Sequence, residues 1–137
     1  MKMLSFALTL LASQAALALG PIPNGEYLGS TTCQSAGEEP FNVFSKVVVG
    51  DRTLTNVLEG EPHEKVFEMV DRTNFIVRAG SDIGFGQFTS DGVNFEISIN
   101  GVKGEDRYRY LDGIVYLTGS ADIQGLRYLC YGFFKPE

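Results

Sequence analysis

The chain has no tryptophan, a single histidine and two cysteines among its 137 residues. Two cysteines and one histidine are too few to form a four-ligand zinc site by themselves. Basic residues are also scarce, because 11 Lys and Arg stand against 17 Asp and Glu and give a formal net charge of −6. This balance argues against nucleic acid as a partner, since domains that bind it usually present a basic face to the phosphates.

Sequence signals of catalysis are absent as well. No Gly-x-Ser-x-Gly or Cys-x-x-Cys motif occurs, and the only histidine, His63, stands between two glutamates and directly after Pro62. These surroundings predict a solvated loop residue rather than a general base. The sequence therefore predicts no catalytic residue, no metal and no cofactor, and we expect a protein that is not an enzyme.

The N-terminus has the pattern of an export signal. Lys2 gives a short positive start, residues 4–12 are apolar, and Ala16-Leu17-Ala18 provides small residues at a cleavage site. Ser13 interrupts the apolar run before it reaches the length that a bilayer requires. We therefore expect a signal peptide at 1–18 that is cleaved after Ala18, and a single domain at 19–137. The mature chain has no second long apolar run, so we expect no integral membrane segment and a secreted or periplasmic location.

Export would place the cysteines in an oxidising compartment. There we expect Cys33 and Cys130 to form a disulfide, with two buried thiols as the alternative. The disulfide would close a loop of about a hundred residues, for which chain entropy predicts roughly 4–5 kcal/mol of stabilisation.

Apolar and polar residues alternate along most of the chain, which is the period of a half-buried β-strand. A helix at 59–70 is disfavoured by Pro62 and by β-branched neighbours. The pattern predicts about eight to ten short strands. The expected segments are 26–34, 41–49, 53–58, 65–70, 73–79, 85–89, 93–99, 107–111, 114–118 and 126–134.

Turn-forming dipeptides separate these segments. Asp112-Gly113 gives the strongest hairpin signal, and Asn100-Gly101 and Asp91-Gly92 are of the same kind. Consecutive hairpins predict an antiparallel meander. Because the two cysteines lie in the first and last strands, their bond would join the ends of the meander and close it into a barrel. A β-sandwich is the alternative.

The Gly-x-Tyr-x-Gly opening at Gly25-Glu26-Tyr27-Leu28-Gly29, together with the export signal, the meander and the disulfide, resembles a lipocalin or a related calycin barrel. In lipocalins the opening motif has tryptophan at the place of Tyr27. The resemblance concerns architecture and covers most of the mature chain. It implies a ligand pocket without assigning any residue to it.

Aromatic and basic side chains provide candidates for such a pocket. Residues two apart share a face of a strand, so Arg107 and Arg109 point one way, and Tyr108 and Tyr110 the other. Inward arginines could bind an anionic group, whereas inward tyrosines would add polar tips to an apolar cavity. A third arrangement has the arginines on the outer face, paired with acidic neighbours. The candidate ligand-binding residues are Phe75, Phe88, Phe95, Arg107, Tyr108, Arg109, Tyr110 and Tyr128.

The last segment is apolar on both faces, with Leu129, Tyr131 and Phe133 sharing one of them. Two functions follow as expectations. The first is an exported non-enzymatic barrel that binds a small apolar or amphipathic molecule. The second is a protein-interaction module, such as an inhibitor, an adhesion protein or a host-facing factor, which would use its loops or the last strand.

Overall fold

The computed structural model describes residues 20–137. The expected signal peptide at 1–18 and its cleavage site lie outside these residues. All regular structure in the described part is β-strand, as the alternation predicts. The strands are β1 (Gly25–Ser35), β2 (Phe41–Gly50), β3 (Thr53–Leu58), β4 (Glu61–Met69), β5 (Asn74–Ala79), β6 (Asp82–Phe88), β7 (Gly92–Ile99), β8 (Val102–Leu111), β9 (Ile114–Ile123) and β10 (Leu126–Pro136).

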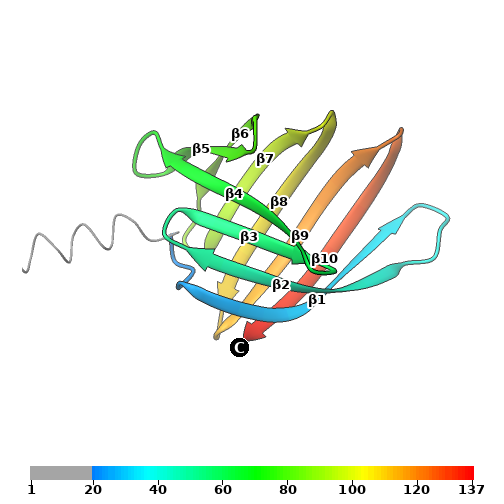
Figure 1. The fold of residues 1–137 in the computed structure, drawn as a ribbon, viewed down its shortest axis with the longest axis horizontal. Helices are drawn as coiled ribbons and strands as arrows, with labels where there is room; N and C mark the ends of the chain where they lie inside the picture. Colours follow the sequence, from blue (N-terminus) through cyan, green and yellow to red (C-terminus); the bar gives the residue numbers. More distant parts are fainter. Residues whose placement is uncertain (1–19) are drawn as a thin grey trace, which may run out of the picture.

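The strands form one closed barrel in which each strand pairs with its neighbours in sequence and β1 pairs with β10. All pairs are antiparallel. In Figure 1, β1–β4 and β7–β10 cross at a large angle, and the short strands β5 and β6 connect the two groups. The closed meander confirms the expected all-β barrel, and the β-sandwich alternative is wrong.

The pairing of β1 with β10 carries the disulfide. Cys33 lies directly opposite Cys130, the two Cα atoms are 4.1 Å apart, and the sulfurs are bonded. The bond therefore joins the first strand to the last, as the sequence predicts.

Two-residue turns set the register of the hairpins. Asn100 and Gly101 both have positive φ, at 52° and 81°, and Asp112 and Gly113 have 52° and 80°. Two consecutive positive φ angles are characteristic of the type I′ turn, whose twist matches that of the flanking strands. These residues therefore fix which side chains of β7, β8 and β9 stand opposite one another.

Strand β4 differs from the expectation. It begins at Glu61, before the expected start at 65, so Pro62 and His63 belong to a strand. Proline is tolerated there because it lies next to the beginning of the strand, where few ladder hydrogen bonds are lost. The prediction that His63 lies in a loop is wrong, although its side chain is exposed.

The core fills one end of the barrel. Phe67, Phe75 and Tyr108 are each at most 1% exposed, and the rings of Phe67 and Phe75 meet edge-to-face with centroids 4.8 Å apart. Ile22, which precedes β1, is completely buried in the same cluster. Next to it, the Tyr27 hydroxyl donates a hydrogen bond to the Pro23 carbonyl at 2.7 Å. The chain before β1 thus contributes to the core that closes this end.

Removal of the disulfide tests its contribution to stability. We expect the double variant Cys33→Ser/Cys130→Ser to lose about 4 kcal/mol of unfolding free energy, because the open chain regains loop entropy when it unfolds. Guanidinium unfolding followed by circular dichroism measures this loss. Native protein in excess reductant should show the same loss. An unchanged midpoint in both samples would contradict the expectation.

Candidate functional site

The alternation along β8 separates the residues of the Arg-Tyr-Arg-Tyr segment. Tyr108 is fully buried and Tyr110 packs against the core, whereas Arg107 and Arg109 are exposed on the outer face. The arginines lie outside and the tyrosines inside, as in the third arrangement considered from sequence. Only Arg109 pairs with an acidic side chain, that of Asp91, whereas Arg107 bonds to Asn94.

The inward aromatic candidates pack against one another. Phe75 and Phe95 are 1% and 4% exposed, and the Phe95 ring stacks on Tyr108 with centroids 6.1 Å apart. The ring of Phe88 packs against that of Phe75, with ring centroids 5.0 Å apart. Tyr128 is half-buried on β10. Because these rings fill space in the core, the structure supplies more evidence for a packing role than for a ligand site at this end.

A polar layer crosses the barrel interior beside this core. The Asn56 amide donates to the Tyr108 hydroxyl at 3.5 Å, and Lys65 is 6% exposed although it carries an amine. Desolvation lowers the pKa of Lys65, and the nearby Asp106 opposes this change. Desolvation raises the pKa of Asp106, which Lys65 opposes in turn. Burial also raises the pKa of Tyr108 well above its usual value, so the phenol stays protonated.

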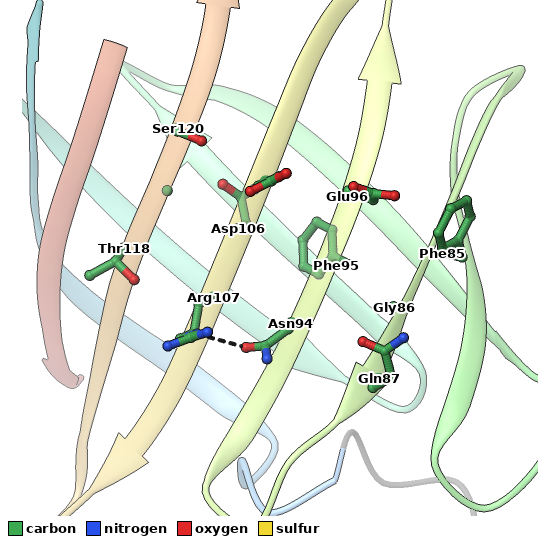
Figure 2. Close-up of a pocket in the computed structure, with 12 residues that line it drawn as sticks. Phe85, Gly86, Gln87, Asn94, Phe95, Glu96, Asp106, Arg107, Thr118 and Ser120 are labelled. Carbon is green, nitrogen blue, oxygen red and sulfur yellow. Dashed lines mark hydrogen bonds between the residues drawn. The ribbon is translucent and has the colours of Figure 1, made fainter. Parts of the chain in front are cut away.

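A groove of about 510 Å³ lies over β6, β7, β8 and β9, within the volume range of small-molecule sites. Figure 2 shows its side chains in front of these strands, with β1–β4 behind them. Most of the groove side chains belong to the outer set of each strand. The groove is therefore on the outer face of the barrel, and not in the interior that the lipocalin resemblance implies.

Register places the outer side chains of the groove in two rows across the four strands. Each residue stands directly opposite the next one in its row, which brings Cβ atoms to about 4.5–5.5 Å from each other. The first row is Gln87, Asn94, Arg107 and Thr118, and the second is Phe85, Glu96, Glu105 and Ser120.

The outer rows contain one cation and two carboxylates at the centre of the groove, and Asp106 from the polar layer also lines it. The Arg107 Nε donates to the Asn94 Oδ1 at 3.1 Å, which orients the guanidinium along the first row (Figure 2). Glu96 and Glu105 face each other in the second row, and no basic nitrogen of residues 20–137 lies within 4.0 Å of either carboxylate. The groove thus presents a donor and several acceptors, with an excess of negative charge.

Arg109 has a different environment. Its Nη2 lies 2.8 Å from Asp91 Oδ2 in the β6–β7 connection, and its Nε donates to the same oxygen. These bonds, together with one from Thr89, hold the pKa of Asp91 below its usual value. Arg109 therefore serves to fix the connection, whereas Arg107 lines the groove.

An apolar surface continues from the groove onto β10. Tyr131 stands opposite Thr118, and Leu129 stands opposite Ser120. Tyr131 and Leu129 are 56% and 58% exposed. On the far side of the groove, Phe85 is 60% exposed. The polar groove is therefore flanked on both sides by exposed apolar side chains.

Sequence reasoning found Arg107 and missed the other outer residues of the groove. The information was present in the two hairpins. Asp112-Gly113 places Arg107 opposite Thr118, and Asn100-Gly101 places Glu96 opposite Glu105. The register set by both turns, combined with the alternation of inward and outward side chains along each strand, would have placed these side chains on one face of the sheet.

Comparison with known proteins shows the fold. No family model and no curated protein matches the chain. Among solved structures, the S-type phycobiliprotein lyase CPES from Guillardia theta is similar, with a TM-score of 0.65 and 9% sequence identity over 83% of this chain and 88% of that one. The similarity supports the barrel architecture expected from the lipocalin resemblance.

The same comparison corrects the expectation that the protein is not an enzyme. The similar barrel is named a lyase, so this fold also occurs in a protein named for catalysis. A meander of this kind therefore gives no reason to assign a non-enzymatic function.

The pH dependence of stability tests the polar layer. Because burial raises the pKa of Asp106 above 3.8, the folded protein keeps a proton there after the unfolded chain has lost it. The free energy of unfolding should therefore fall as the pH rises from 3.8 through the raised pKa of Asp106 in the folded protein. We expect Asp106→Asn to remove this contribution, so that the variant gains stability relative to the native protein as the pH rises above 3.8.

Urea unfolding at several pH values measures this difference, and Asp82→Asn is the control because Asp82 lies at the start of β6, outside the polar layer. The prediction would be contradicted if the free energies of unfolding of Asp106→Asn and the native protein differed by the same amount at every pH.

Proposed function

We propose that the chain is an exported barrel that binds a small, uncharged amphipathic molecule in the outer groove over β6–β9. The polar part of the ligand contacts Arg107, Glu96 and Glu105, and the apolar part lies against the exposed side chains that flank them. The observation that carries the proposal is the groove itself, in which polar side chains from four strands meet between Phe85 and Tyr131.

Shape and chemistry both support binding at this place. Small-molecule sites combine apolar walls with a few polar groups that orient the ligand. Here Asn94 holds the Arg107 side chain in one direction, which reduces the entropy lost when a ligand binds. A rigid barrel beneath the groove keeps the rows in register, as sites built on strands are held more firmly than sites on loops.

Charge restricts the ligand. Glu96 and Glu105 outweigh Arg107, and the whole chain carries a formal charge of −6. An anion would be repelled by both the groove and the protein. An uncharged molecule that donates hydrogen bonds to the carboxylates is the better match.

The disulfide supports export, since such bonds persist in oxidising compartments. In residues 20–137 there is no helix long and apolar enough to cross a membrane. With the signal peptide expected at 1–18, the proposed location is the periplasm or the extracellular space.

Titration with N-phenyl-1-naphthylamine, an uncharged fluorescent aromatic molecule with one N–H donor, tests the proposal. We expect saturable binding that Phe85→Ala weakens about tenfold, equivalent to about 1.4 kcal/mol of lost apolar contact. Ile83→Ala is the matched control, because Ile83 is exposed on the same face of β6 but does not line the groove.

Amide chemical-shift mapping then locates the bound dye. Shifts confined to β6–β9 and β10 are expected. The assignment of the groove as the site would be contradicted if Phe85→Ala and Ile83→Ala bound the dye equally well. Chemical-shift changes that centre on the interior residues of β3 and β4 would contradict it too.

A second candidate function is binding of a protein partner, favoured by exposed apolar side chains on β9 and β10, and by Phe44 on β2 beyond Ser30 of the intervening strand β1. Phe133 and Phe44 are 55% and 68% exposed, and Tyr116 stands directly opposite Phe133. A patch of this kind is typical of an interaction site. A photocrosslinking residue at Phe133, with Arg78 as the control position, tests it in the native medium. A crosslinked protein found at Phe133 alone supports this function, and identical products at both positions contradict it.

A further inference from the structure

The second row of the groove presents paired hydrogen-bond acceptors. Glu96 on β7 and Glu105 on β8 stand directly opposite each other, so their carboxylates project from neighbouring points on the outer face. An ionised carboxylate only accepts hydrogen bonds, and its two oxygens accept from two donors at once. Adjacent hydroxyl groups of one molecule satisfy this requirement, because each supplies a donor at a short and fixed separation.

The first row adds donors and groups of mixed character. Arg107 donates through its guanidinium, whose direction is set by the bond to Asn94. Thr118 stands opposite Arg107. In the second row, Ser120 stands opposite Glu105, and its Oγ accepts a hydrogen bond from Arg127 Nη2 at 3.3 Å. Hydroxyl side chains both donate and accept, so they match hydroxyl groups of a ligand in either sense.

An exposed aromatic ring completes the arrangement. Phe85 is 60% exposed and stands directly opposite Glu96, at the end of the carboxylate row. The face of an aromatic ring carries partial negative charge and attracts C–H groups. A ligand suited to this site therefore has hydroxyl groups along its rim and a C–H face that covers the ring.

The same features weigh against other ligands. The carboxyl groups of Glu96, Glu105 and Asp106 outnumber the guanidinium groups of Arg107 and, bonded to Ser120 at the edge, Arg127, which disfavours an anion. A metal ion is not indicated either, because residues 20–137 contain no cluster of three or more His, Cys, Asp or Glu side chains placed to hold one. A molecule without any hydrogen-bonding group would leave Glu96, Glu105 and Arg107 covered without partners, at a cost in binding free energy.

We infer that the ligand of the outer groove is an uncharged saccharide. Glu96 and Glu105 accept hydrogen bonds from neighbouring hydroxyls, Arg107 donates to a ring or hydroxyl oxygen, and Phe85 stacks on the C–H face of the sugar. This inference rests on the proposed function, and it specifies the polar part of the amphipathic ligand. An attached apolar group would extend across Thr118 and Ser120 toward Leu129 and Tyr131.

Saturation-transfer NMR and titration with cellobiose, maltose, N,N′-diacetylchitobiose and octyl β-glucoside test the inference on the intact, disulfide-bonded protein. We expect saturable binding of at least one of these sugars, with the strongest saturation on ring C–H protons. Octyl β-glucoside should bind more tightly than glucose, which is titrated beside it for comparison, because the octyl chain reaches the apolar surface of β10.

Variants identify the groups that carry the binding. Glu96→Gln and Glu105→Gln should each weaken sugar binding about tenfold, since an amide replaces a charged acceptor. Phe85→Ala should abolish the saturation of ring protons. Glu64→Gln is the matched control, because Glu64 is an exposed carboxylate on the outer face of β4 and should leave binding unchanged.

The outcomes separate this inference from the proposed function. If no sugar binds but N-phenyl-1-naphthylamine still occupies the groove, the saccharide assignment is wrong and the groove remains a ligand site. If neither probe binds, both are wrong. Sugar binding that is insensitive to Glu96→Gln, Glu105→Gln and Phe85→Ala would also overturn the assignment of these residues.

Discussion

The pairing of β1 with β10 is the interaction on which the rest of the structure depends. It turns a ribbon with two free edges into a barrel with none, and the bond between Cys33 and Cys130 holds the two strands together at one point of that ladder. Free edges would expose unpaired backbone groups and invite association with other chains. Closure also defines an inside and an outside, so that each residue's place in the alternation decides its environment.

This division determines where binding chemistry is found. Inward positions of β4, β5, β7 and β8 carry the rings that pack the core, and Tyr108 reaches the polar layer formed with Asn56, Lys65 and Asp106. Outward positions of β6–β9 carry charged, amide and hydroxyl side chains at matching heights. Type I′ turns align β7, β8 and β9, and β6 pairs in register with β7, so the outer residues form rows and the rows form a groove. The barrel thus acts as a rigid frame for a surface site.

Much of the fold was predictable, because three features of the sequence indicate one topology. They are the alternation of apolar and polar residues, the Asp-Gly and Asn-Gly turns, and the cysteines in the terminal strands. The start of β4 was not, since Pro62 reads as a turn former until the pairing with β3 is known. The direction of the Arg107 and Tyr108 side chains was also open, because apolar and charged residues alternate there without identifying the inner face. The groove depends on Phe85, Glu96 and Ser120 from three separate strands, and no local motif joins them.

Hydrogen exchange in the native, disulfide-bonded protein tests the closure of the barrel most directly. Amide protons that link β1 to β10 should exchange as slowly as those that link β7 to β8, because both ladders lie within one continuous sheet. Fast exchange along the facing sides of β1 and β10, with slow exchange elsewhere, would mean that these strands are edges and that the barrel is open.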